Sequence, residues 1–256
     1  MKKPAADDAG TKVRIHKIIA KTGRLSLRAA ERAIAEGRVD VNGQTVTQKG
    51  ATADPLHDQI RLDGEWIGHR DPYVYLMMYK PTGYVTTRSD EEGRRTVMDL
   101  LPKEYSRLFP VGRLDIMTEG LLLLTNDGDF CQAILAPRNR VERVYHVKVR
   151  NIPEKKVLEK MESGITVDGE KLKVISARMA SATQNNARLE LTLIEGKKRH
   201  IRRLCQTLGH PAMKIKRVAF GGLRLGSLKP GEVVHVPVEK INIIKKMAGL
   251  SIKKKK

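Results

Sequence analysis

Apolar residues at the start of the chain are spaced first as in a helix and then as in strands. The apolar positions between residues 13 and 19 have helical spacing and predict a short first helix. Ser26 is a typical N-cap for a second helix over residues 27–36, and Gly37 supplies its C-terminal stop. The chain is therefore predicted to open with a pair of helices.

Two short runs, residues 39–41 and 44–46, flank the dipeptide Asn42-Gly43. Asn-Gly between alternating runs is a strong signal for a two-residue β-hairpin. Residues 60–62 predict one more strand. Residues 12–64 are thus predicted to form a small helix–helix–strand domain.

The polar stretch 65–72 predicts a linker, and the chain after it is rich in strand-like patterns. Apolar residues from Ile201 to Leu208 are spaced as on an amphipathic helix, which Gly209 ends. Other runs predict strands over 74–79, 84–87, 121–125, 141–149 and 188–194, a turn at 80–83 and a short helix over 129–136. Hairpins outnumber regular βαβ units, so we expect an α+β fold with a mixed, mainly antiparallel sheet over residues 73–248. Residues 1–11 are predicted to be a disordered tail and 249–256 a basic tail.

Charge narrows the choice of partner. The 256-residue chain has a formal net charge of +20, which favours binding to polyanions, above all nucleic acid. A membrane surface is the weaker alternative, because no basic amphipathic helix with an aromatic apolar face is evident. The chain also has no apolar run of membrane-spanning length and no signal-peptide stretch at its start, so we expect a cytoplasmic protein.

Cysteine and aromatic residues are sparse. Cys131 and Cys205 are far apart, without the neighbours that a zinc site needs, so no metal is expected. The chain has no Gly-rich dinucleotide loop and no P-loop, so no cofactor is expected. Aromatic residues are only 4% of the chain, which disfavours a surface that reads RNA mainly by stacked bases.

Asp115 is the first candidate for chemistry. It ends the segment Gly112-Arg113-Leu114-Asp115, just before an apolar run, and a carboxylate held in such a loop can act as nucleophile or base. From spacing alone, a turn or cap role is the commoner one for a loop aspartate. A glycosidase-like carboxylate pair with Glu119 is a further alternative.

Several ordered motifs carry a family resemblance. The N-terminal segments Arg14, Ser26–Arg32, Gly37–Val39 and Val41–Gly43 resemble an S4 RNA-binding domain, whose helix pair forms a basic RNA-facing surface. Four later motifs resemble pseudouridine synthases, more narrowly the RsuA/RluB family that modifies bacterial ribosomal RNA. They are Lys80-Pro81-x-Gly83, Gly112–Gly128, Glu142-Arg143-x-Tyr145 and Glu195–Arg203.

The resemblance implies three site residues. Asp115 would be the nucleophile, Tyr145 would lie against the target uracil and share in proton transfer, and Arg202 would form an ion pair with Asp115. A guanidinium beside a carboxylate keeps it ionised and fixes its direction. From the pattern alone, a core residue is the better interpretation of Tyr145, and either Arg202 or Arg203 could face inward. His200 departs from the family, where many relatives have Gln or Glu.

The resemblance also implies a reaction without a cofactor. A uridine would flip out of its stack, its C1′–N1 bond would break, and the uracil would rejoin through C5. The residues expected to contact RNA are Arg14, Arg28, Arg32, Arg38, Lys80, Arg113, Lys197, Lys198, Arg199, Arg203, Lys214, Lys216 and Arg217. The basic ones between Gly196 and Arg217 are expected to form one RNA-backbone groove beside the active site. Solvated surface charge is the plainer interpretation, and Arg28 and Arg32 could simply pair with Glu31 and Glu36.

The expected substrate is ribosomal RNA in an assembling subunit, and the enzyme is expected to act as a monomer. Similarity of Tyr79–Pro81, Thr87–Val97 and Pro137–Glu142 to the RluB branch favours the large-subunit (23S) RNA over the small-subunit (16S) RNA. Two alternatives stay open. One is a non-catalytic ribosomal protein that binds RNA through the S4 domain. The other is a glycosylase that would release the base.

Overall fold

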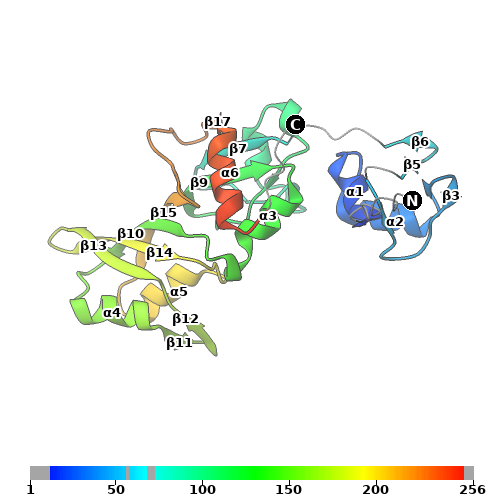
Figure 1. The fold of residues 1–256 in the computed structure, drawn as a ribbon. Coiled ribbons are helices and arrows are strands. Elements are labelled where there is room, and N and C mark those ends of the chain that lie inside the picture. Colours follow the sequence, from blue (N-terminus) through cyan, green and yellow to red (C-terminus); the bar gives the residue numbers. More distant parts are fainter. Residues whose placement is uncertain (1–11, 56–57, 68–72, 251–256) are drawn as a thin grey trace, which may run out of the picture. The chain divides into compact units, whose positions relative to one another are not determined.

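The computed structural model describes residues 12–55, 58–67 and 73–250. Contacts divide the chain into two units, Met1–Tyr73 and Val74–Lys256, and each is described here by itself (Figure 1). The predicted tail 1–11 and residues 251–256 of the predicted basic tail lie outside the described residues. None of the helices in the described ranges is both long and apolar enough to cross a bilayer.

The first unit has two helices and short strands around a small apolar core. Its elements are β1 (Val13–Arg14), α1 (Ile15–Lys21), α2 (Leu27–Ala35), β2 (Val39–Val41), β3 (Gln44–Thr45), β4 (Thr52–Ala53), β5 (Ile60–Leu62) and β6 (Glu65–Trp66). The Ser26 hydroxyl accepts a hydrogen bond from the Ala29 amide at 3.2 Å, which is the expected N-cap. Asn42 and Gly43 both have positive φ, as a tight Asn-Gly hairpin requires.

The predicted linker began too early. Residues 65–66 form β6, which pairs with β5, and the Ile67 amide donates to the Ile60 carbonyl at 3.0 Å. Ile67 is buried in the core of the first unit, because its side chain completes the apolar cluster around α1 and α2. Residues 68–72 lie outside the described part of the chain. At the other end, Gly249 and Leu250, expected in the basic tail, hydrogen-bond to the last turn of the final helix.

The second unit is built on one large sheet. Its strand order is β13-β14-β10-β15-β9-β7-β17, with β16 on β15 and β8 on β9. The strands are β7 (Tyr75–Lys80), β8 (Phe109–Pro110), β9 (Thr118–Thr125), β10 (Arg143–Arg150), β13 (Ser176–Ala182), β14 (Asn186–Leu193), β15 (Ala212–Phe220), β16 (Leu223–Arg224) and β17 (Val233–His235). Only the β15–β9 pair is parallel. The mixed, mainly antiparallel α+β fold is thus confirmed.

Helices cover this sheet unequally. They are α3 (Gly128–Leu135), α4 (Lys155–Ser163), α5 (His200–Thr207) and α6 (Val238–Met247), with 3-10 turns η1 (Val97–Leu100), η2 (Lys103–Tyr105) and η3 (Pro137–Asn139) and a small hairpin of β11 (Ile165–Val167) and β12 (Glu170–Leu172). In Figure 1, α4, α5 and the β11–β12 hairpin lie toward the β13 end of the unit, and α6 lies near β7, β9 and β17. Each end of the sheet therefore has its own helices.

Strand β9 belongs to two cores at once. Leu122 and Leu124 join the apolar cluster that also contains Leu204 of α5. Leu121 and Leu123 join the other cluster, with residues of α3 and α6. Because neighbouring side chains of a strand point to opposite faces, the four-leucine run is buried on both sides.

The expected strand over residues 84–87 is not part of the sheet. Val85 makes one isolated parallel bridge to Thr96 instead. The sheet position beside β7 is taken by β17, whose Val233 pairs with Met78. A later segment with an apolar strand pattern thus displaces the local hairpin partner.

Candidate active site

Asp115 lies in the loop that leads from β8 into β9. Lys80, at the end of β7, fixes this loop from beneath. Its ammonium donates to four backbone carbonyl oxygens: Pro81 at 3.0 Å, Asp115 at 3.3 Å, Ile116 at 3.4 Å and Thr118 at 2.9 Å. The backbone from Asp115 to Thr118 is thereby held in place.

Lys80 was expected to contact RNA, and the structure corrects this. The residue is 0% exposed, so its charge is not available to a ligand at the surface. Burial lowers the pKa of Lys80 to about 8, and the carboxylates of Asp115 and Glu119 offset part of that shift. The lysine of the first motif is a structural support for the loop that carries Asp115.

Two further contacts fix the same loop. The Thr86 hydroxyl donates to the Leu114 carbonyl at 2.8 Å and accepts from the Leu114 amide at 3.3 Å. Gly120 lies opposite Arg217 in the parallel β9–β15 pair, with φ of 109°. A Cβ at this position would collide with the Arg217 backbone, 2.7 Å from its nitrogen. Glycine is therefore required for the close approach of the two strands.

A pocket of about 90 Å³ brings together Asp115, Tyr145 and Arg202, the three residues assigned by the resemblance. They come from the loop before β9, from β10 and from α5, segments far apart in the sequence. The rest of the lining includes Thr118, Leu193 and Ile215, together with several cationic groups. Such a half-exposed carboxylate beside an aromatic ring and a guanidinium suits attack on a small planar base.

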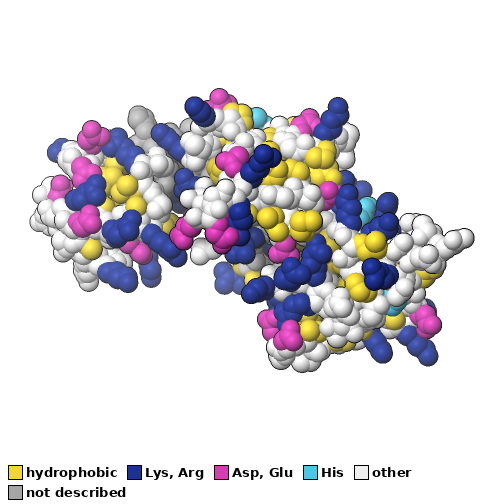
Figure 2. Space-filling view, turned by 180° about the vertical axis from the view of Figure 1, so that it is seen from behind, with side chains coloured by type: hydrophobic (Ala, Val, Ile, Leu, Met, Phe, Trp, Pro, Cys, Tyr) yellow, Lys and Arg dark blue, Asp and Glu magenta, His cyan; other side chains and the backbone are white. Residues whose placement is uncertain are grey.

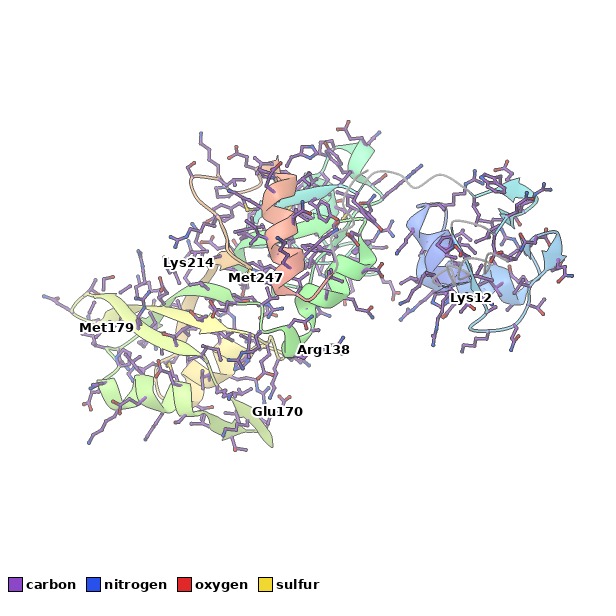
Figure 3. The ribbon with its side chains drawn as sticks, in the orientation of Figure 1. Lys12, Arg138, Glu170, Met179, Lys214 and Met247 are labelled. Carbon is purple, nitrogen blue, oxygen red and sulfur yellow. The ribbon has the colours of Figure 1, made fainter. Side chains whose placement is uncertain are left out.

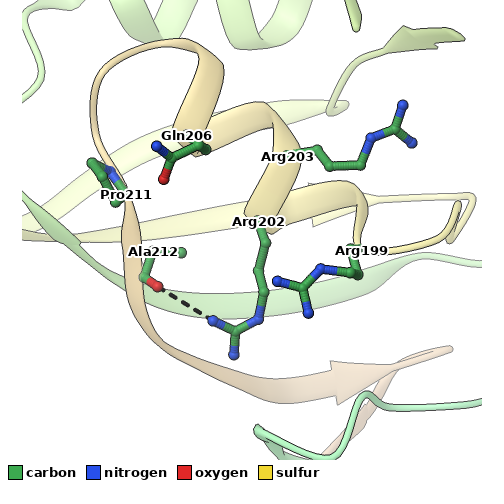
Figure 4. Close-up of a pocket in the computed structure, with 6 residues that line it drawn as sticks. All are labelled: Arg199, Arg202, Arg203, Gln206, Pro211 and Ala212. Carbon is green, nitrogen blue, oxygen red and sulfur yellow. Dashed lines mark hydrogen bonds between the residues drawn. The ribbon is translucent and has the colours of Figure 1, made fainter. Parts of the chain in front are cut away.

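The expected ion pair between Arg202 and Asp115 is not formed in this structure. The Arg202 guanidinium donates instead to the Met117 carbonyl at 3.1 Å. It also donates to the Ala212 carbonyl at 3.3 Å (Figure 4). Both acceptors are neutral, so the arginine ties the loop after Asp115 to the start of β15. Its charge still lies in the pocket that Asp115 lines.

The structure also distinguishes the two neighbouring arginines. Arg203 points away from Arg202 and Arg199 (Figure 4). Its guanidinium pairs with Glu170 at 2.6 Å and Asp168 at 3.2 Å, on the β11–β12 hairpin. The hydrogen bond that Arg203 donates to Glu170 raises the pKa of Arg203 and lowers the pKa of Glu170. Arg203 holds the hairpin to α5, and its expected RNA contact is corrected accordingly.

Tyr145 serves both interpretations that the sequence left open. It is 8% exposed and belongs to the apolar cluster with Val147 and Val149. It also lines the pocket. A core tyrosine whose ring reaches a pocket wall presents a rigid aromatic surface to a ligand.

His200, at the start of α5, is a pocket residue to which we assigned no role from the sequence. It is 4% exposed, and neither ring nitrogen has a hydrogen-bond partner of good geometry within the described residues. Burial lowers the pKa of His200, and the nearby Glu195 carboxylate and the Lys173 backbone offset only part of that shift. The imidazole is therefore neutral at pH 7. The family departure at this position was the only sequence signal for it.

The expected single basic groove over Gly196–Arg217 is divided by the fold. Lys197, Arg199 and Arg202 line the pocket, and Lys198 is exposed nearby. Arg113, before Asp115, is exposed and lines the pocket too. Figure 2 shows many Lys and Arg side chains across the larger unit on the face that it presents.

The three basic residues of β15, Lys214, Lys216 and Arg217, do not line the pocket. Lys214 pairs with Glu119 at 3.0 Å, and the Lys216 ammonium lies 4.6 Å from the Tyr79 ring centroid, toward the core of α3 and α6. Arg217 is 2% exposed and donates to the Leu121 carbonyl at 2.7 Å. Because side chains alternate along β15, Lys214 and Lys216 point to the face opposite the pocket residue Ile215. The single groove was therefore a wrong prediction, and Arg217 is too buried to contact RNA.

Three of the four arginines that were predicted to contact RNA from the first unit make no ion pair within the described residues. Arg14, Arg28 and Arg32 are exposed and make no ion pair with any described residue, so the suggested pairing with Glu31 and Glu36 is absent. Arg38 differs, because Asp63 binds its guanidinium through two hydrogen bonds of 2.7 Å. Arg38 was expected to contact RNA, but it instead forms a structural ion pair that joins the start of β2 to the end of β5.

Comparison with known proteins tests the family resemblance. A family model for RNA pseudouridylate synthase matches residues 74–207, and an S4 domain model matches residues 13–60. The chain is 35% identical over 237 residues to ribosomal large subunit pseudouridine synthase B of Bacillus subtilis, covering 92% of this chain and 96% of the relative. The chain belongs to the RNA pseudouridine synthase family. It is therefore an isomerase with an RNA substrate.

Other relatives agree with this assignment. An uncharacterized RNA pseudouridine synthase of Aquifex aeolicus is 38% identical over 221 residues, covering 86% of this chain and 88% of the relative. A crystal structure of a pseudouridylate synthase superimposes with a TM-score of 0.64 and 27% identity, covering 91% of this chain and 99% of that one. The S4-plus-synthase organisation and the enzyme class are thus confirmed.

Proposed function

We propose that this synthase converts one specific uridine of large-subunit (23S) ribosomal RNA into pseudouridine. The observation that carries the proposal is the convergence of Asp115, Tyr145 and Arg202 on one pocket, with Asp115 on a loop held by Lys80. The name of the Bacillus relative supports the large subunit over the small-subunit (16S) RNA. We propose that the enzyme acts as a monomer, on RNA of an assembling subunit.

The reaction follows from what the pocket can hold. A uridine buried in folded RNA must leave its stack for its C1′–N1 bond to reach Asp115. The Asp115 carboxylate promotes cleavage of that bond, and the uracil lies against Tyr145 while it turns. C5 then bonds to C1′, the hydrogen on C5 leaves, and N1 gains a proton. Product and substrate have the same composition, as an isomerisation requires.

Arg202 has a positioning role in this scheme. In the unliganded pocket it holds the carbonyl oxygens of Met117 and Ala212, and these bonds set the loop that follows Asp115. We propose that its charge also keeps Asp115 ionised once the RNA displaces water, since the carboxylate would otherwise be favoured in its neutral form.

The remaining exposed cations position the RNA. Those around the pocket are Arg113, Lys198 and Arg199, and beside them lies the half-buried Lys197, which pairs with Glu195. Those on the first unit are Arg14, Arg28 and Arg32. Contacts of this kind bind phosphates and set the register without reading bases.

The deciding experiment is a pseudouridine map of both ribosomal RNAs from cells with the native protein, without it, and with Asp115→Asn. Asparagine keeps the side-chain shape and removes only the carboxylate. We expect one 23S site to vanish without the protein, to return with the native protein and to stay absent with Asp115→Asn. A missing 16S site would move the target to the small subunit. Full activity of Asp115→Asn would overturn the proposed nucleophile.

The neighbouring arginines provide a matched pair of variants. Arg202→Gln should lower kcat at least a hundredfold and leave the free energy of unfolding nearly unchanged. Arg203→Gln removes two partly exposed ion pairs, worth about 1 kcal/mol or less of stability, and should leave kcat close to native. Single-turnover pseudouridine formation and urea unfolding measure the two effects. Equal losses of kcat would contradict the assignment of Arg202 to the pocket.

A further inference from the structure

Three basic residues lie side by side on neighbouring strands of the large sheet. Lys148 on β10 is directly opposite Arg188 on β14 and Lys214 on β15. We call these three residues the basic ladder. Figure 3 labels Lys214 on β15, and Met179 on β13 at the far edge of the same group of strands. Hydrogen-bonded strands are about 4.8 Å apart, so the three cations form a compact row.

The ladder is on the face of the sheet opposite the pocket. Along β10, Tyr145, Val147 and Val149 are buried beneath α4 and α5, whereas Lys148 and Arg150 are exposed. By the same alternation along β14, Leu189 is buried on the pocket side and Arg188 points to the other face of the sheet. The cluster beneath α3 and α6 contains no residue of β13 or β14. This part of the sheet is thus covered on the pocket side and bare on the other.

The charges of this bare face are not balanced. Within the ladder, Lys214 pairs with Glu119, and in the next row Glu190 pairs with both Arg178 and His146. Lys148, Arg188 and Arg150 make no ion pair with any residue in the described ranges. Like charges directly opposite each other on a sheet are destabilising. The sheet therefore carries an electrostatic cost that a bound polyanion would relieve.

The composition of the face indicates which polyanion fits. In these two rows, the outward-facing residues of β10, β13, β14 and β15 include no aromatic ring other than the His146 imidazole. All of these residues lie within the described part of the chain. Unstacked bases need aromatic platforms, whereas the backbone of paired RNA needs only cations in a row.

We propose that the basic ladder is a second RNA-binding surface, which binds the phosphate backbone of a double-helical segment away from the target uridine. This proposal rests on the proposed function only in taking RNA as the partner. The pocket holds the target nucleotide on one face of the sheet, and the ladder binds a second segment of the same folded RNA on the other. The enzyme would thereby recognise the shape of a large RNA and not a short strand alone.

The test measures binding of the full chain to a 20-base-pair RNA duplex of non-ribosomal sequence over a range of salt concentrations. The variant is Lys148→Gln/Arg188→Gln. The matched control is Lys156→Gln/Lys160→Gln on α4, which loses the same charge from exposed positions. Each lost phosphate contact should reduce the slope of log K against log salt by about 1, so we expect a reduction of about 2 for the ladder variant only.

Equal slopes for the ladder variant and the control would overturn the proposal. A second result would also overturn it: polyaspartate binds as tightly as the duplex, and the ladder variant loses both kinds of binding equally. The partner would then be an acidic protein. Asp115→Asn separates this test from the proposed function. It should abolish pseudouridine formation and leave the salt slope native, so either proposal can fail while the other stands.

Discussion

The two halves of the large sheet have different sequence patterns, and the difference decides where a ligand can reach each half. In the central half, Leu121–Leu124 is an unbroken apolar run, and its side chains fill one core on each face. In the outer half, residues 143–150 of β10 alternate between buried and exposed from Tyr145 onward. A continuous run therefore marks a strand without a free face, and an alternating run marks a strand with one face open to partners.

The pocket lies where the halves meet. The parallel pair of β9 and β15 joins them, and Asp115 enters from the central side while Tyr145 comes from the outer side. The proposed catalytic residues thus lie beside the only parallel pair among the described strands of this sheet.

The largest effect should come from Gly120→Ala at this junction. The new methyl group would collide with the backbone of Arg217, which cannot move without separating β9 from β15. We expect a loss of about 4 kcal/mol or more in the free energy of unfolding, and loss of activity. Gly169→Ala is the control, because Gly169 also has positive φ but has open space at its Cβ position. It should cost about 1 kcal/mol. Similar costs in urea unfolding would show that backbone angle, not close approach, dominates at Gly120.

A second pair of variants compares the halves directly. Leu123→Ala removes a side chain that is 2% exposed and should cost about 2 to 5 kcal/mol. Lys148→Ala in the outer half should change stability by no more than about 0.5 kcal/mol, and toward a gain, because it removes like-charge repulsion. Urea unfolding of both variants measures the contrast. A loss above 1 kcal/mol for Lys148→Ala would show that the open face is structurally required.

A pH dependence of stability is expected at Lys80. Its folded-state pKa of about 8 lies below the ordinary value of 10.5, so the unfolded chain binds more protons between these two pH values. Stability from this group therefore rises as pH increases through that window. Comparison of native protein with Lys80→Met should show their difference in unfolding free energy grow in favour of the native protein from pH 8 to 10.5. A difference that stays constant with pH would mean that the pKa of Lys80 is not lowered in the folded protein. Because Lys80→Met leaves buried carbonyl oxygens unpaired, it should also cost about 2 kcal/mol at pH 7.

Much of the fold followed from periodicity. The predicted helix over 129–136 is found at Gly128–Leu135, and the strand over 141–149 at Arg143–Arg150. Helices α4 and α6 were not predicted. Met161 is the only fully buried residue of α4, so its apolar pattern is too sparse to stand out. The prediction of a strand over residues 84–87 was wrong because the sheet position beside β7 is occupied by β17, which lies more than a hundred residues later in the chain.

For the site, the three pocket residues were predicted from the sequence, but the directions of the basic side chains were not. Motif order alone indicated Asp115, Tyr145 and Arg202, and the fold brings them to one pocket. Which cations face the RNA could not be predicted, because charge in a sequence does not show direction. Lys80 and Arg217 are buried against carbonyl oxygens, and Arg38 and Arg203 are bound by carboxylates that only the fold brings near.

The support beneath Asp115 also has a consequence for the order of folding. The carbonyl oxygens that Lys80 binds on the Asp115 loop are 35 to 38 residues away along the chain. Such contacts form only after the intervening loop has closed, at the entropic cost of non-local pairing. The loop therefore reaches its working shape only when β7 and β9 are already paired. We therefore expect a newly made chain to assemble the Asp115 loop late, together with the sheet that carries it.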